Sequence, residues 1–311
     1  MKILICPLNW GLGHATRCVP IIQQLINENH ELTIVSDGFP LQFLRQEFST
    51  LRYIELPSYP IQYSKNKSML WSMIRCFPKI ISGIIIEHLW LKKLLKTEHF
   101  DQVISDNRFG MWNKSTHSIY ITHQLMVKMP YYLKAFEPAI WLLHRTFINK
   151  YNECWIPDTE KNGGSSGDLA HKYPLPKNAK FIGTLSRFQN TGNKISNFDF
   201  ETVAVVSGVE PQRTLFEKNL IDKYKNQASK TLIVKGQPQN TIQKTTIGNV
   251  TLVSHLSSAE LAAYLRGAKK IIVRSGYSTI MDLQALNCLE KAEFIPTPGQ
   301  TEQEYLKSFH S

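Results

Sequence analysis

The sequence contains few cysteines, and none of them lies in a pattern that holds a metal or a disulfide. The five are scattered, no two form a CxxC pair, and no His/Cys cluster has the spacing of metal ligands. An odd, scattered set is typical of reduced thiols, so we expect a cytoplasmic protein without a bound metal. These cysteines are Cys6, Cys18, Cys76, Cys154 and Cys288.

Targeting patterns and long uncharged runs are also missing. Residues 1–5 lead directly into a strand pattern without the features of a signal peptide, and no uncharged run is long enough to span a bilayer. The sequence lacks dense Lys/Arg runs with interleaved aromatic residues and lacks a helix-turn-helix pattern, which argues against a nucleic-acid partner. The net charge of +11 nevertheless favours an anionic partner, such as a nucleotide or an anionic membrane surface.

What the sequence does contain is the alternation of an α/β protein. Its 311 residues, 42% hydrophobic and 20% charged, suffice for two domains with a core each. Short apolar runs typical of buried strands alternate with stretches of helical spacing, which indicates mainly parallel sheets. A polar stretch, residues 186–200, separates two such series. We therefore predict two α/β domains, residues 1–190 and 200–311, with a ligand cleft between them.

The first domain opens with a β-turn-α-β unit whose turn contains two glycines. The strand pattern at residues 3–8 is followed by the turn at 9–14, and helical spacing continues from 15 to 29. The turn follows the carboxyl end of the strand, where open α/β sheets bind ligands. It differs from the dinucleotide fingerprint, because no third glycine follows Gly13.

A second turn follows the strand pattern at residues 270–273. Residues 274–279 are mostly small, and helical spacing follows from Ile280. Such a turn leaves backbone N–H groups at the positive end of a helix dipole, which can bind an anion. Gly276 lets a phosphate approach the backbone closely, and Asp282 could accept from a ribose diol. A capped helix in an ordinary α/β domain fits the same pattern equally well.

Three motifs together resemble those of glycosyltransferases with the GT-B fold. They are Gly11-Leu12-Gly13-His14, the turn at 274–282, and Pro296-Thr297-Pro298-Gly299-Gln300-Thr301-Glu302-Gln303. They are most similar to the family 28 type, which includes the N-acetylglucosaminyl transferase of peptidoglycan synthesis. The resemblance implies an α/β protein of two Rossmann-like domains facing each other across a cleft. It also implies a UDP-sugar donor held mainly by the C-terminal domain, and metal-independent, inverting hexosyl transfer without a cofactor.

The resemblance further implies which residues hold the donor. The turn from Ser275 to Thr279 would contact the diphosphate, Asp282 would bind the ribose hydroxyls, and Glu302 with Gln303 would bind the sugar hydroxyls. The expected donor-binding residues are Gly13, Arg274, Ser275, Gly276, Tyr277, Ser278, Thr279, Asp282, Gln300, Glu302 and Gln303.

Two departures from the family pattern bear on activity. The first loop lacks the longer glycine run of the peptidoglycan enzyme, which leaves the acceptor open. The chain ends at Ser311, whereas family members usually continue, often with a helix that crosses back onto the N-terminal domain. We therefore expect an incomplete C-terminal domain. A catalytically inactive nucleotide-sugar-binding relative is the alternative to a transferase.

Glycosyl transfer needs a base for the acceptor hydroxyl, and the sequence offers two candidates. His14 either acts as that base, or only caps the helix or contacts the donor phosphate. Asp106 ends another strand pattern and is either the base or a helix N-cap. Arg17 either balances phosphate charge or is a solvated helix residue, and His123 either lines the acceptor side or is an ordinary loop residue.

The stretch at residues 68–96 is unusually apolar for a helical connection and carries a net charge of +4, from five basic residues and one acidic residue. Pro78 and Gly83 are expected to break it into at least two helices. Apolar faces with Trp and Lys are typical of an interfacial helix, which would place the protein at the inner face of the membrane with a lipid-linked acceptor. The alternative is that these residues are the core face of helices that cover the first sheet.

Overall fold

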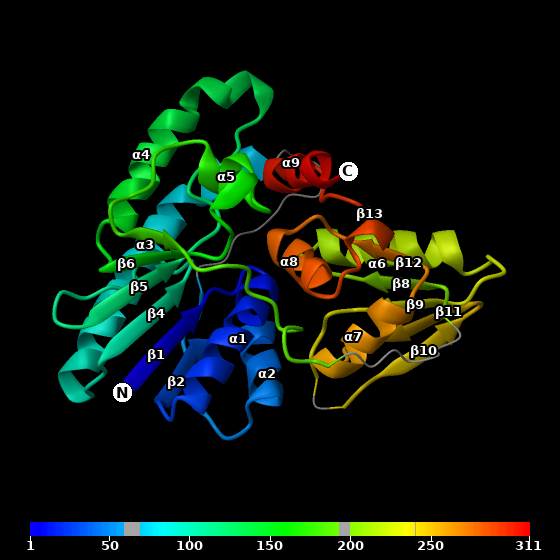
Figure 1. Ribbon diagram of the computed structural model, residues 1–311, viewed down its shortest axis with the longest axis horizontal. Coiled ribbons are helices and arrows are strands. Elements are labelled where there is room, and N and C mark those ends of the chain that lie inside the picture. Colours follow the sequence, from blue (N-terminus) through cyan, green and yellow to red (C-terminus); the bar gives the residue numbers. More distant parts are fainter. Residues whose placement is uncertain (59–68, 193–199, 240) are drawn as a thin grey trace.

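The computed structural model describes residues 1–58, 69–192, 200–239 and 241–311, and of residues 69–77 it describes the backbone only. They form two Rossmann-like domains, as predicted (Figure 1). The first contains a seven-stranded sheet of order β3-β2-β1-β4-β5-β6-β7, and the second a six-stranded sheet of order β10-β11-β9-β8-β12-β13. Residues 193–199 of the polar stretch at 186–200, where the domain boundary was predicted, lie outside the described residues.

The strands of the first sheet pair in parallel throughout the described register. They are β1 (Lys2–Pro7), β2 (Glu31–Ser36), β3 (Arg52–Glu55), β4 (Gln102–Asp106), β5 (His117–Ile121), β6 (Glu153–Ile156) and β7 (Ala179–Phe181). The helices of this domain are α1 (Gly13–Asn27), α2 (Gly38–Glu47), α3 (Met69–Thr97), η1 (Tyr131–Phe136), α4 (Glu137–Ile148), η2 (Lys161–Gly163) and α5 (Asp168–His171).

The second sheet is parallel except for the antiparallel pair of β10 and β11. Its strands are β8 (Thr202–Val205), β9 (Thr231–Val234), β10 (Lys244–Ile247), β11 (Val250–Val253), β12 (Lys270–Val273) and β13 (Ala292–Phe294). Its helices are α6 (Gln212–Tyr224), α7 (Ser258–Gly267), α8 (Tyr277–Ala285), η3 (Leu289–Lys291) and α9 (Thr301–His310).

Alternation along β1 places helices on both faces of the first sheet. Ile3 and Ile5 pack with the apolar residues of α1 and α2, whereas Leu4 and Cys6 pack on the other face with Leu91 of α3. Strand order reverses between β1 and β4 in the first sheet and between β8 and β12 in the second. Ligands of open α/β sheets bind at such switch points, so the two glycine turns lie where the fold places a site.

The expected break at Pro78 and Gly83 is wrong, because α3 is one continuous helix of 29 residues. Proline lacks one N–H donor, and a helical glycine costs about 1 kcal/mol relative to alanine. Packing of the C-terminal half of α3 against the sheet outweighs such costs, since Glu87 and Leu91 are buried. Within the described residues, no helix combines the length and apolarity needed to cross a membrane.

Helix α9, with which the sequence ends, lies against the N-terminal domain (Figure 1). Thr301 Oγ1 donates to the carbonyl of Lys128 (2.6 Å), and the backbone N–H of Asp168 donates to Tyr305 Oη (2.7 Å). The Lys128 ammonium also lies 4.3 Å from the centre of the Tyr305 ring. Helix α9, which carries the end of the third motif, therefore contacts the N-terminal domain.

Candidate active site

The N-termini of two helices, one from each domain, meet between the two sheets. Helix α1 follows β1, α8 follows β12, and Ser278 Oγ of α8 donates to the carbonyl of Gly13 in α1 (3.0 Å). Within these two described helices, neither first turn contains an acidic residue and neither N-cap makes a side-chain hydrogen bond. The positive ends of two helix dipoles thus converge on one place, which favours an anion there. Helix α8 begins at Tyr277, three residues earlier than predicted, with Gly276 as its N-cap.

A cleft of about 470 Å³ lies beside this meeting point and is lined by both domains. The first domain contributes the start of α1 and the end of α2, and the second contributes the ends of β8, β9 and β11 and the first turns of α8. Its lining includes Gly13, Thr16, Phe43, Gln46, Glu47, Val206, Ser207, Gly236, His255, Leu256, Ser278, Thr279 and Asp282.

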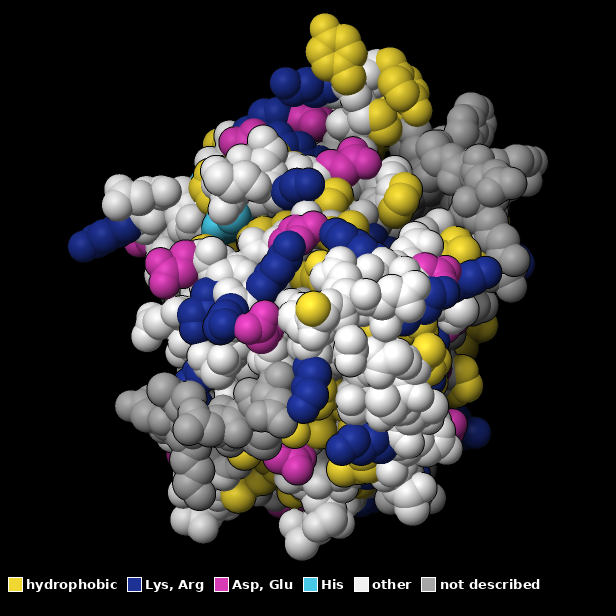
Figure 2. Space-filling model, turned by 90° about the vertical axis from the view of Figure 1, so that its right-hand side faces the viewer, with side chains coloured by type: hydrophobic (Ala, Val, Ile, Leu, Met, Phe, Trp, Pro, Cys, Tyr) yellow, Lys and Arg dark blue, Asp and Glu magenta, His cyan; other side chains and the backbone are white. Residues whose placement is uncertain are grey.

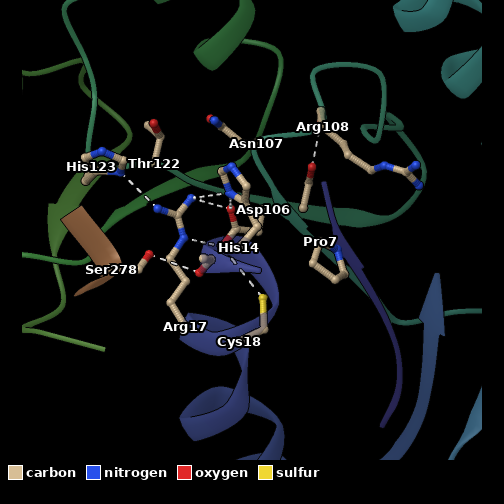
Figure 3. Close-up of polar contacts among 12 residues, drawn as sticks. Pro7, His14, Arg17, Cys18, Asp106, Asn107, Arg108, Thr122, His123 and Ser278 are labelled. Atoms are coloured by element: carbon tan, nitrogen blue, oxygen red, sulfur yellow. Dashed lines mark hydrogen bonds and ion pairs between the residues drawn. The ribbon is translucent and has the colours of Figure 1, made fainter. Parts of the chain in front are cut away.

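His14 and Asp106, the two candidate bases, form one pair (Figure 3). His14 Nδ1 lies 2.7 Å from Asp106 Oδ1, and Asp106 is fully buried at the end of β4. Burial lowers the pKa of His14 and outweighs the opposing charge of Asp106, so its imidazole is neutral at pH 7. Neither residue caps a helix, which was the alternative role considered for each from the sequence. Asp106 lies in a strand, and the N-cap of α1 makes no side-chain hydrogen bond.

Arg17 completes a buried cluster around the same carboxylate. Its Nε donates to Asp106 Oδ2 (2.5 Å), and its Nη2 donates to Asp106 Oδ1. Burial alone would raise the pKa of Asp106, but the charge of Arg17 and the pairing with His14 outweigh burial and lower it to about 2. Asp106 is therefore ionised at neutral pH and orients its neighbours, which leaves the neutral imidazole of His14 as the candidate base.

The cluster extends into the second domain through His123, which follows β5. Arg17 Nη1 lies 2.9 Å from His123 Nδ1, and His123 Nε2 lies 3.0 Å from Glu302 Oε1 in α9. The His123 ring stacks on Tyr277 of α8, with ring centres 4.3 Å apart. Burial raises the pKa of Glu302, but its bond to His123 and the nearby positive charges outweigh burial and lower that pKa. Glu302, expected to hold sugar hydroxyls, is thus placed beside the catalytic pair.

Several residues of the expected donor set hold the loops of the second domain. Arg274 donates to the carbonyls of Ile295, Pro296 and Gln212, and its guanidinium lies 4.0 Å from the centre of the Phe216 ring. The expectation that Arg274 contacts the donor is therefore wrong, because its charged group is turned into the domain.

The other expected residues divide between the loops and the cleft. Ser275 Oγ donates to the carbonyl of Gln303, whose side-chain oxygen accepts from the Thr297 N–H (2.8 Å). Tyr277 Oη donates to the carbonyl of Pro157 in the first domain (2.7 Å). Gln300 is the N-cap residue of α9. Of the expected donor residues, Gly13, Ser278, Thr279 and Asp282 line the cleft.

Asp282 brings in two residues that the sequence did not single out. Ser186 Oγ donates to Asp282 Oδ1 (2.6 Å), and Arg187 Nε lies 3.5 Å from Asp282 Oδ2. Burial raises the pKa of Asp282, and these partners only partly oppose that rise. His255, also missed, follows β11 and could have been found by applying the rule of carboxyl-terminal strand ends to every strand.

No family model and no curated protein matches the sequence. Solved structures do match nearly the whole chain. The spinosyn rhamnosyltransferase SpnG superposes with a TM-score of 0.62 at 13% identity, covering 98% of this chain and 84% of SpnG. Arabidopsis thaliana UGT89C1, complexed with UDP-L-rhamnose, gives a TM-score of 0.57 at 11% identity, covering 98% of this chain and 82% of that one.

A third match shows that this fold also serves another reaction. A Listeria monocytogenes protein provisionally assigned as a UDP-N-acetylglucosamine 2-epimerase gives a TM-score of 0.51 at 11% identity, covering 98% of this chain and 86% of that one. Likeness at such low identity shows architecture and leaves the reaction to be argued from the site. The chain has the GT-B fold, which these glycosyltransferases share.

Proposed function

We propose that this protein is a glycosyltransferase that moves a sugar from a UDP-sugar to a hydroxyl acceptor. The observation that carries the proposal is the placement of the His14–Asp106 pair directly beside the two converging helix N-termini. A neutral imidazole supplies the base, and the helix ends stabilise the diphosphate that departs. The fold of nucleotide-sugar transferases supports the same reading.

The proposed reaction is a single displacement that inverts the anomeric carbon. His14 Nε2 takes the proton of the acceptor hydroxyl as its oxygen forms a bond to the anomeric carbon. The bond from that carbon to the phosphate oxygen breaks, and the diphosphate leaves with the electron pair. Asp106, hydrogen-bonded to His14 Nδ1, orients the ring and stabilises the imidazolium that forms. No step requires a cofactor, and Ser278 and Thr279 lie where the diphosphate would bind.

The test is a comparison of binding with turnover. A thermal-shift panel of nucleotides and nucleotide sugars should identify a donor, since a ligand of the native state raises the unfolding temperature. Transfer of the sugar from that donor to a hydroxyl acceptor, and hydrolysis of that donor by water, would then be measured. Binding without any turnover would favour the inactive nucleotide-sugar-binding relative, and an absence of nucleotide binding would contradict both readings.

We propose further that the acceptor is lipid-linked and that the first domain contacts an anionic membrane surface. On α3, within residues 68–96, Ile85, Ile86 and Leu89 are more than half exposed, and Lys92 and Lys93 beside them are also exposed. These side chains face away from the sheet that Leu91 covers, so α3 both packs on the core and presents an apolar outer face.

A second apolar surface, which the sequence analysis missed, lies on η1 and α4. Tyr131 and Tyr132 are 93% and 67% exposed, and Phe136 is also exposed. Figure 2 shows hydrophobic side chains projecting at the top of the molecule, the end at which Figure 1 places η1 and α4. Glu137 is buried and paired with Lys172, so the exposed charge there comes from Lys134.

Sedimentation with vesicles tests the membrane contact without any transfer assay. We expect co-sedimentation with anionic vesicles at low salt, weakened when Ile85, Ile86 and Leu89 are replaced by serine and when Tyr131, Tyr132 and Phe136 are replaced by serine. Binding should fall at high salt, because the charges are screened. Parent protein that stays in the supernatant with anionic vesicles would favour an acceptor that is not membrane-bound.

A further inference from the structure

Arg17 contacts three groups of the site at once and is almost fully buried. Its side chain is 1% exposed, its Nε and Nη2 donate to Asp106, and its Nη1 contacts His123 (Figure 3). Arg17 is therefore not a solvated helix residue, which excludes one of the two roles considered from the sequence. It is also not among the residues that line the cleft, and its contacts are with the groups around Asp106.

The guanidinium fixes which nitrogen of His123 carries hydrogen. A guanidinium donates hydrogen bonds and cannot accept them. Nδ1 of His123, 2.9 Å from Arg17 Nη1, therefore accepts, and a neutral His123 carries its hydrogen on Nε2. That hydrogen is donated to Glu302 Oε1 at 3.0 Å. Arg17 thus orients Glu302 indirectly, through the tautomer of His123.

His14 has two possible partners, and the choice between them decides whether it can act as a base. Its Nδ1 lies 2.7 Å from Asp106 Oδ1 and 3.0 Å from Arg17 Nη2. With hydrogen on Nδ1, it donates to Asp106 and leaves the Nε2 lone pair for an acceptor proton. With hydrogen on Nε2, its Nδ1 would accept from Arg17 and the ring could not accept a proton at Nε2. Because the Asp106 carboxylate already accepts from Arg17 Nη2 and has no hydrogen to donate, its 2.7 Å contact with His14 Nδ1 requires the hydrogen to lie on Nδ1, which is the first arrangement.

We propose that Arg17 is the positioning residue of this site, which holds His14 in the tautomer that can accept a proton and, through His123, holds Glu302 in place. The proposal rests on the proposed function, because His14 needs a working tautomer only if it is a base. The charged and titratable groups that face His14 are Arg17 of α1, Asp106 of β4, His123 after β5 and Glu302 of α9. Arg17 is the member that contacts His14, Asp106 and His123 together.

NMR spectra of protein labelled with ¹⁵N-histidine show directly which ring nitrogen of each histidine carries the hydrogen. We expect the spectrum of the parent to show His14 protonated at Nδ1 and His123 protonated at Nε2, each assigned by loss of its signals in a variant. Arg17→Lys keeps the charge but lacks the planar fork that reaches Asp106 and His123 together. In this variant we expect both histidines to become tautomer mixtures and turnover to fall at least tenfold, with a smaller change in donor KM.

His123→Ala removes the link to Glu302, together with the contacts of His123 with Arg17 and Tyr277, but leaves Arg17 and Asp106 around His14. It should raise donor KM several-fold and leave the His14 signals unchanged. Two control variants make the same kinds of substitution outside this site. Arg213→Lys alters another buried arginine, paired with Glu210 and Glu217, and His171→Ala removes another stacked histidine that contacts a carboxylate. Neither should alter the signals of His14.

The outcomes separate this proposal from the proposed function. A parent spectrum with any other tautomer pattern overturns the role of Arg17, even if Arg17→Lys does not fold. Unchanged His14 and His123 signals in a folded Arg17→Lys protein overturn it as well. The spectra need neither donor nor acceptor, so they decide the role of Arg17 independently. Full turnover in His14→Ala would instead overturn the assignment of His14 as the base.

Discussion

At the scale of single residues, the site is organised by one buried carboxylate. Asp106 accepts from both Arg17 and His14, and its oxygens have no contact with the cleft lining. An isolated buried carboxylate would take up a proton, but a guanidinium at hydrogen-bond distance keeps it ionised. The ionised form then fixes the orientation of two side chains, His14 and Arg17, that come from one turn of α1.

The first prediction concerns the pH dependence of stability. The pKa of Asp106 is about 2 in the folded protein, against 3.8 for an unperturbed aspartate. Its ionised form therefore stabilises the fold above about pH 4, and this contribution of about 2 kcal/mol is lost as the pH falls from about 4 through 2. Urea unfolding of the parent between pH 6 and 2.5 should show this loss. Asp106→Asn should be less stable at pH 6 and lose less on acidification; equal losses in the two proteins would contradict the assignment.

The second prediction concerns His14. Its ring is neutral at pH 7 because burial lowers its pKa, so replacing it removes a working base. His14→Ala should lower turnover by about 100-fold or more, while donor affinity changes little. Steady-state kinetics and calorimetric titration of UDP measure the two effects separately. A loss of donor affinity equal to the loss of turnover would show that His14 serves the phosphate instead.

At the scale of elements, the proposed donor site depends on two helix N-termini that face each other. Gly276, the N-cap of α8, has open space beside it: a Cβ placed there would lie 3.9 Å from Thr279 Oγ1 and 4.0 Å from Gln303 Nε2. Gly13 has no such open space, because a Cβ placed there would lie 3.0 Å from Ser278 Oγ. The two glycines therefore permit different experiments on the same anion site.

The third prediction uses this difference. Gly276→Val should fold with nearly the stability of the parent, but bind UDP at least tenfold more weakly, because the side chain occupies the space of the phosphate. Gly13→Val should lose stability as well, since Ser278 must move. Calorimetry with UDP and thermal unfolding without ligand distinguish the two. Parent-like UDP affinity in folded Gly276→Val would place the diphosphate elsewhere.

The sequence predicted the elements better than the contacts between them. Both glycine turns and the strands before them were found because apolar runs and glycines are local signals. Arg17 was not understood, because its role depends on Asp106 and His123, about ninety and one hundred residues away. Arg274 was assigned to the donor from its place in a motif, although its side chain turns inward to three carbonyls. Pro78 was expected to end a helix because local propensity carries no information about the sheet that α3 packs against.

At the scale of the whole molecule, contacts between the domains bring together His14, the proposed base, and Glu302, which the resemblance assigns to the donor. Glu302 belongs to α9, and α9 is held on the first domain by Thr301, Tyr305 and His310, whose Nε2 lies 2.8 Å from the carbonyl of Ser165. Ser278 and Tyr277 add contacts from α8. The separation of His14 from Glu302 therefore depends in part on how the loop at residues 158–168 holds α9 through Ser165 and Asp168.

The last prediction tests this arrangement with two glycines of that loop. Gly167 has φ +52°, and a Cβ there would collide with Tyr305 Oη and lie 3.0 Å from the Phe309 ring. Gly163 also has a positive φ, +75°, but nothing lies within 4 Å of such a Cβ, so Gly163→Ala places an alanine at positive φ in the same loop without the collision. Gly167→Ala should displace α9, lower turnover by tenfold or more relative to Gly163→Ala, and leave UDP affinity within threefold, because α9 does not line the cleft. Urea unfolding would compare the stability of the two variants. Equal turnover in both would show that the contact of α9 with this loop is not needed to place Glu302 in the site.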